Sequence, residues 1–131
     1  MSGKNSIIGK RYFFTRDGNR YYRIDFARIR YIEARKSYCR IEMGDKIRMA
    51  AIGIGELEEL LPPEDFCRIH RSYIVGVAHI EWFENSVVRV ADQELPIGDA
   101  YRAELPRKVM LVPGETHRMR VRSAGKSLAI V

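Results

Sequence analysis

Short runs of alternating apolar and polar residues dominate this chain of 131 residues, and Gly, Asp and Asn separate the runs. Alternation is strictest over 38–43, where every second residue is apolar: Cys39, Ile41 and Met43. A period of two is the spacing of side chains on one face of a β-strand. A tight turn at Gly44-Asp45 follows, and we expect Ile47 and Met49 to continue the apolar face on the return strand. The pattern predicts a mostly β domain.

Two segments have the spacing of short helices instead. Leucines at i, i+3 and i+4 give 55–61 one apolar stripe, and Pro62-Pro63 ends it. The second helix is predicted from Gly98 to about Leu105, and we expect a stop or a kink at Pro106 because proline lacks a backbone donor. Segment 74–80 fits either a strand or a short helix. Further strand-like runs span 11–15, 21–24, 28–34, 87–90 and 93–97.

The composition, with 46% hydrophobic and 31% charged residues, is ordinary for one soluble domain. No apolar run approaches the roughly 18 residues that a membrane span needs, and the N-terminus does not resemble a secretory signal. We therefore expect a cytoplasmic protein without membrane contact. The expected organisation is an N-terminal extension over 1–10, one domain over 11–112, and a basic tail over 113–131 that forms either an extra strand or a mobile segment.

The net charge of +6 is unevenly distributed along the chain. Residues 1–50 hold 13 basic and 5 acidic residues, whereas residues 51–66 hold 5 acidic residues and no basic one. A basic surface beside an acidic helix would attract a phosphate backbone. Basic charge alone does not distinguish nucleic-acid binders from other basic proteins.

The sequence offers little for catalysis or metal binding. His70 has no acidic neighbour, and neither a nucleophile motif nor a phosphate-binding glycine loop is present. Cys39 and Cys67 lie in apolar stretches without Cys or His at metal-ligand spacing, so we interpret them as reduced core thiols, with a disulfide as the alternative. We expect no enzyme activity, no catalytic residue, no cofactor and no metal.

Four segments together resemble the LytTR family of bacterial DNA-binding domains, and they follow one another along the chain in the family's order. The segment 66–80, FCRIHRSYIVGVAHI, is similar to the family signature. The other three are RIRYIEA at 28–34, GELEELLP at 55–62, and LPIG followed by YRAEL within 95–105. The resemblance covers roughly Arg11 to Leu111. It implies an elongated stack of mainly antiparallel β-sheets with two short helices, in which loops enter the major groove of duplex DNA.

The resemblance also implies where DNA would bind. The loop 35–38 joins two strands of a hairpin, Arg71 occupies a base-contacting position, and the last helix begins at Gly98. Candidate DNA-binding residues are Arg35, Lys36, Ser37, Tyr38, Arg68, His70, Arg71 and Arg102. From chemistry alone, the loop could be a solvated hairpin tip, Arg68 a solvated arginine, and His70 a structural residue bonded to a backbone carbonyl. Two departures from the family pattern are Gly76, where the family usually has Asn, and Ala100, where it often has a basic residue.

As a LytTR domain the chain would be a transcription regulator of the response-regulator output type. The residues before Arg11 are too few for a receiver domain, so we expect a stand-alone domain. Either a sensor or regulator protein controls it in trans, or the chain is a fragment, or its DNA binding is constitutive. Family sites are often direct repeats, which implies two copies side by side on double-stranded DNA. The alternatives are a protein–protein adaptor that keeps the framework, and a module for nonspecific or single-stranded nucleic-acid binding.

Overall fold

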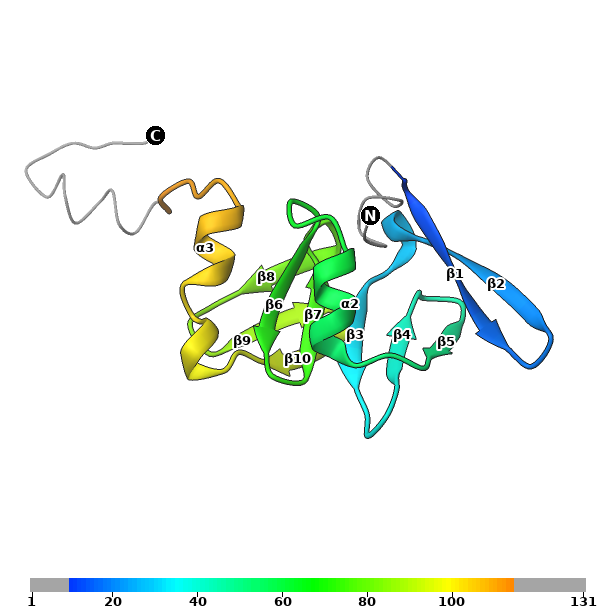
Figure 1. The fold of residues 1–131 in the computed structure, drawn as a ribbon. Helices are drawn as coiled ribbons and strands as arrows, with labels where there is room; N and C mark the ends of the chain where they lie inside the picture. The colour runs from blue at the N-terminus through cyan, green and yellow to red at the C-terminus, as the bar shows by residue number, and fades with distance from the viewer. Residues whose placement is uncertain (1–9, 115–131) are drawn as a thin grey trace, which may run out of the picture.

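The computed structural model describes residues 10–114, which form a mostly β domain with two short α-helices (Figure 1). The strands are β1 Tyr12–Asp17, β2 Arg20–Asp25, β3 Tyr31–Ala34, β4 Cys39–Glu42, β5 Ile47–Ala50, β6 Phe66–His70, β7 Tyr73–Gly76, β8 Ile80–Phe83, β9 Val87–Val90 and β10 Gln93–Pro96. The helices are α2 Ile54–Leu60 and α3 Glu104–Lys108, and three 3-10 turns are η1 Phe26–Arg28, η2 Val77–His79 and η3 Asp99–Tyr101. The predicted fold class is confirmed.

Antiparallel pairing joins the strands into three sheets. The largest has the order β5-β4-β3-β7-β6, the second has the order β10-β9-β8, and β1 and β2 form a separate hairpin. In Figure 1 this hairpin lies at one end of an elongated molecule, α3 lies at the other, and the five-stranded sheet lies between them. The elongated stack follows from sheets that pack one after another.

The five-stranded sheet is covered on both faces. One face packs Ile32, Ile41 and Ile74 against Leu57 of α2 and Ile24 of the hairpin. The other packs Cys67, Ile69 and Val75 against the three-stranded sheet and α3. Each fully buried aliphatic side chain contributes about 1.5–3 kcal/mol through its removal from water. Two-sided burial explains why β7 is an unbroken apolar run, since a strand covered on both faces has no side left for polar residues.

The prediction for the apolar face of β5 is wrong by one residue. Ile47 lies opposite Glu42 and Met49 lies opposite Arg40, and both are exposed, at 43% and 49%. Ala50, opposite Cys39, is the residue that continues the buried face. Directly opposed residues point to the same side of a sheet, so the register set by the turn decides the face. Counting the alternation through the turn therefore gave the wrong side.

The end of the domain also differs from the prediction. The expected helix from Gly98 to Leu105 is a 3-10 turn over Asp99–Tyr101, and α3 begins only at Glu104. Pro106 is then the third residue of α3 and does not end it. The first turn of a helix has no intrahelical partners for its backbone N–H groups, so a proline there removes no hydrogen bond. The ambiguous segment 74–80 contains most of β7, the 3-10 turn η2 and the first residue of β8.

The two cysteines are free and buried, which confirms reduced core thiols. The Cys39 thiol donates to the backbone oxygen of Ile52 at 3.3 Å. Burial raises the pKa of both thiols, that of Cys67 to about 11. Within residues 10–114 no helix is long and apolar enough to cross a membrane. The predicted basic tail lies almost entirely outside the described residues.

Candidate nucleic-acid interface

The loop 35–38 between β3 and β4 is a short turn with an exposed tip. The backbone N–H of Arg35 donates to the Tyr38 oxygen at 2.8 Å, which closes the turn. Arg35, Lys36 and Ser37 are exposed, whereas Tyr38 is half-buried. The Arg35 guanidinium lies 3.3 Å from a Glu33 carboxylate oxygen, so its charge is partly balanced. No hydrogen bond or ion pair engages the Lys36 side chain within residues 10–114, so its charge faces water.

The turn between β6 and β7 presents Arg71 and is shaped by His70. The His70 Nδ1 atom accepts a hydrogen bond from the backbone N–H of Ser72 at 3.0 Å. The His70 ring also lies against Tyr73, with 5.6 Å between ring centroids. An accepting Nδ1 carries no proton, so neutral His70 holds its proton on Nε2. His70 therefore bonds to the backbone and shapes the turn, as the structural interpretation expects, but its partner is the N–H group of Ser72 rather than a carbonyl oxygen.

The Arg68 side chain stabilises this turn by hydrogen bonds to its backbone. Its guanidinium donates to the backbone oxygens of His70 at 2.7 Å and Arg71 at 2.8 Å, and to Glu58 of α2 at 2.7 Å. The Arg68 side chain is only 15% exposed. Sequence reasoning missed this role, because the partners include two backbone oxygens and a residue of a distant helix. The Arg71 side chain is exposed, and it has no hydrogen bond or ion pair within the described part of the chain.

The loop 35–38 and the β6–β7 turn are neighbours. Strands β3 and β7 pair with Glu33 opposite Tyr73, and one step further the Ala34 N–H donates to the Ser72 oxygen at 2.8 Å. Figure 1 shows both connections at the same edge of the molecule. Segments separated by more than thirty positions in the sequence thus present their basic side chains together.

The segment before α3 joins this edge as a third element. The Gly98 N–H donates to the Ile69 oxygen at 2.8 Å, and a Cβ on Gly98 would lie 3.5 Å from the His70 ring. Arg102 is exposed here and lies 2.8 Å from Asp99, to which it is ion-paired. We name the loop 35–38, the turn 70–72 and the segment 98–102 together the basic edge. The eight candidate residues all lie in or beside it.

The two departures from the family pattern have different consequences in the structure. Gly76 lies at the opposite end of β7 from the basic edge. A Cβ at Gly76 would collide with the Ile29 backbone oxygen, so close backbone packing requires glycine there. Ala100 is exposed on the basic edge and provides no hydrogen-bonding side chain. The first departure concerns packing, and the second removes a potential contact.

The described residues offer little to a metal ion. No group of three or more His, Cys, Asp or Glu side chains in 10–114 is arranged to hold one. The basic edge instead offers guanidinium, ammonium and hydroxyl groups, which bind phosphates and base edges.

Comparison with known proteins agrees with this chemistry. The sequence model of the LytTr DNA-binding domain matches residues 19–110. The CO-responsive transcriptional regulator RcoM of Rhodospirillum rubrum is 38% identical over 60 residues, which cover 46% of this chain and 25% of that protein. The chain thus matches about a quarter of that relative's length. A solved structure, the LytTr DNA-binding domain of a putative methyl-accepting/DNA response regulator from Bacillus cereus, has the same fold. Its TM-score is 0.63 at 23% identity, and the match covers 72% of this chain and 93% of that one. The chain belongs to the LytTR family and carries its DNA-binding domain.

Proposed function

We propose that this domain binds double-stranded DNA in a sequence-specific way, with the basic edge entering the major groove. The observation that carries this proposal is the Ala34–Ser72 backbone hydrogen bond together with the β3–β7 pairing, which hold Lys36 and Arg71 at one edge. The two cationic loops are anchored in one sheet and keep their spacing, so they need not become ordered when DNA binds. A rigid spacing is what reading two positions along a groove requires.

The residues of the basic edge divide into two roles in this proposal. Lys36 binds phosphate, because it projects from a loop tip and its charge faces water. Arg35 joins it when its ion pair with Glu33 opens. Arg71 reads a base, because its planar guanidinium makes no hydrogen bond or ion pair within residues 10–114 and can donate two parallel hydrogen bonds to guanine. Such a pair contributes about 1–3 kcal/mol of base discrimination. Arg68 is a positioning residue that holds the turn carrying Arg71.

The segment 98–102 contributes less in this proposal. Asp99 is 93% exposed and lies beside Arg102, so the pair brings almost no net charge to the DNA. Contact of Arg102 with a phosphate would require this ion pair to open. With Ala100 next to them, the segment contributes shape and backbone contacts more than charge.

We infer that the domain acts in bacterial transcription regulation. The relative from Rhodospirillum rubrum is named a transcriptional regulator, and the structural neighbour is the DNA-binding domain of a putative methyl-accepting/DNA response regulator. Only the regulatory role is extended to this chain, since the signal of the relative belongs to that whole protein. We further propose direct-repeat sites bound by two copies side by side, with the signal supplied by a sensor or regulator protein.

Selection of bound duplexes from a random pool tests the proposal, followed by titration of the enriched site at several salt concentrations. We expect one enriched sequence and a steep loss of affinity with salt, because phosphate contacts release counterions. Binding without sequence preference would contradict base reading and indicate a nonspecific basic surface. A preference for single strands would move the site to the β1–β2 hairpin, where Phe14 and Tyr21 are exposed. No binding at low salt would favour the protein–protein adaptor.

Arg71→Ala separates base reading from phosphate contact. We expect a loss of about 1–3 kcal/mol on the enriched site and little change on unrelated duplexes. Lys36→Ala is the matched variant, and its loss should be similar on every sequence. Arg107→Ala on α3 serves as a control for general charge. Equal losses for Arg71→Ala on all duplexes would refute its assignment as a base-reading residue.

A further inference from the structure

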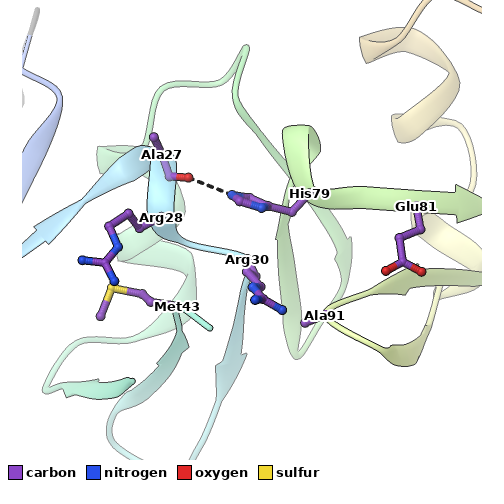
Figure 2. Close-up of a pocket in the computed structure, with 7 residues that line it drawn as sticks. All are labelled: Ala27, Arg28, Arg30, Met43, His79, Glu81 and Ala91. Carbon is purple, nitrogen blue, oxygen red and sulfur yellow. Dashed lines mark hydrogen bonds between the residues drawn. The ribbon is translucent and has the colours of Figure 1, made fainter. Parts of the chain in front are cut away.

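A polar cleft of about 390 Å³ opens at the other end of the five-stranded sheet (Figure 2). Its walls come from the segment before β3, the end of β4, η2, β8 and the β9–β10 turn, and are formed by Ala27, Arg28, Arg30, Met43, His79, Glu81 and Ala91. Arg30 precedes β3, whereas Ala34 ends that strand at the basic edge. At about 3.3 Å per residue the two ends are separated by about 13 Å. The cleft therefore lies at the opposite end of β3 from the basic edge.

Arg30 is the uncompensated charge of the cleft. Arg28 lies 2.6 Å from Asp45, and Glu81 lies 3.4 Å from Arg89, so each of these charges has a partner. The Arg30 guanidinium has neither a hydrogen bond nor an ion pair within the described residues. Its five N–H donors are available to a ligand. Figure 2 shows Arg30 between Met43 on one side and Ala91 and Glu81 on the other.

Arg30 is nevertheless held in place. Its backbone N–H donates to the Glu42 oxygen at 2.8 Å, and its oxygen accepts from Gly76 at 2.9 Å, so it is bonded to β4 and β7. Its guanidinium packs over Gly44, where a Cβ would lie 2.8 Å from Nη2. Gly44 has a φ of +88°, a conformation that favours glycine, and so leaves room for the side chain. The backbone of Arg30 is thus held at a defined position, and its half-buried side chain extends from there into the cleft.

The wall beside η2 is also ordered. The His79 Nε2 atom lies 2.7 Å from the Ala27 oxygen, drawn as a dashed line in Figure 2. A carbonyl oxygen only accepts, so Nε2 carries the proton and donates. This bond connects η2 to the segment that leads into β3. The two arginines and His79 thus line a cleft whose shape exists before binding.

We propose that this cleft binds a small ligand with one anionic group, a carboxylate or a phosphate, held by the Arg30 guanidinium. The planar guanidinium donates two parallel hydrogen bonds to a carboxylate or phosphate. Ala27 and Ala91 add a small apolar surface beside this group for the rest of the ligand. The volume suits a small molecule. A single uncompensated cation matches a ligand with one anionic group. The inference is independent of DNA reading, because none of its residues lies on the basic edge.

NMR titration of the ¹⁵N-labelled full chain at low salt tests the proposal, with inorganic phosphate in one arm and butyrate in the other. We expect saturable shifts at the Arg30 Nε–H and at the backbone of Met43 and His79 in at least one arm. The arm that saturates at lower concentration identifies the anionic group. Shifts confined to residues 35–38 and 70–72, or no saturation in either arm, would overturn the proposal.

Paired variants separate the cleft from the basic edge. Arg30→Gln should weaken the affinity of the cleft for the anion, measured from the shifts at Met43 and His79, at least about tenfold, because hydrogen bonds from a charged donor are lost. Arg71→Gln should leave the cleft shifts unchanged. Glu81→Gln, an exposed change, should tighten binding by removing a nearby negative charge. If neither Arg30→Gln nor Glu81→Gln changed the affinity of the cleft, the assignment of Arg30 as the anion-binding residue would be refuted. Duplex DNA that shifts the Arg30 Nε–H directly would also refute it, by making the cleft a DNA contact.

Discussion

Replacement of Arg68 by methionine tests whether the basic edge is held from within. Methionine keeps the unbranched aliphatic stem of arginine and removes all three polar contacts of the guanidinium. Two of these contacts, to the His70 and Arg71 oxygens, close the β6–β7 turn, and the third joins the turn to Glu58 of α2. The turn should lose its internal support while the strands around it remain paired.

The expected loss of unfolding free energy follows from these contacts. Each bond from the guanidinium to a backbone oxygen contributes about 1 kcal/mol or slightly more. The Glu58 carboxylate is 46% exposed, so its ion pair is screened by water and contributes about 0.5–1 kcal/mol. Arg68→Met should therefore reduce the free energy of unfolding by about 3 kcal/mol. An ordered backbone residue costs about 1–2 kcal/mol of entropy, so the loosened turn should bind the cognate site about tenfold more weakly.

Urea unfolding followed by circular dichroism measures the first quantity, and titration of cognate duplex below the unfolding range measures the second. Glu58→Gln, which removes only the ion pair, should cost about 1 kcal/mol or less. Arg107→Met is the matched control, because the Arg107 side chain is 69% exposed and, among the described residues, pairs with Glu104 alone. If Arg68→Met were as stable as Arg107→Met within about 0.5 kcal/mol, the positioning role of Arg68 would be refuted.

Three further predictions concern packing and titration. Gly76→Ala should destabilise the fold by about 1–3 kcal/mol, because its Cβ would collide with the Ile29 backbone oxygen. Gly55→Ala in α2, with nothing within 4 Å, should be neutral or stabilising, and equal effects of the two variants in thermal unfolding would contradict this. Burial raises the pKa of Cys67 to about 11, so the folded state holds this proton more tightly than the unfolded chain. Unfolding free energy should then fall as pH rises from 9.0 towards about 11, and this part of the slope should vanish in Cys67→Ala. Met49→Ser should change stability by less than about 0.5 kcal/mol because Met49 is exposed; a loss of about 2 kcal/mol in urea unfolding would mean that the outer face of β5 is covered in solution.

Much of the fold could be predicted because its signals are local. Period-two runs predicted the strand regions, the leucine spacing of 55–61 predicted α2 to within one residue, and the apolar surroundings of the cysteines predicted buried thiols. The errors arose where a local pattern met a longer-range constraint. The face of Ile47 and Met49 depends on the register across a turn, and Pro106 is tolerated because the helix begins later than the local pattern suggests.

The candidate site shows the same division. The residue types in 35–38 and 70–72 indicated phosphate and base chemistry, but their proximity depends on the β3–β7 pairing. Arg68 and Arg71 are both arginines of one short motif, and the sequence does not separate them. Their different environments, one bonded inward to Glu58 and two backbone oxygens and the other exposed, arise only when α2 packs against the end of β6.

By itself the sequence determined that this chain is a β domain of the LytTR type with cationic connections between strands, since alternation, turn residues and charge act over a few neighbouring positions. Tertiary structure alone decided which cations gather on one edge, which arginine supports the turn, and that another arginine, without an ion pair inside 10–114, lies in a cleft at the far end of β3. These outcomes depend on strand register and on packing between segments far apart in the chain. The free energy of such a contact depends on both segments together, so it cannot be predicted from the local sequence of either one.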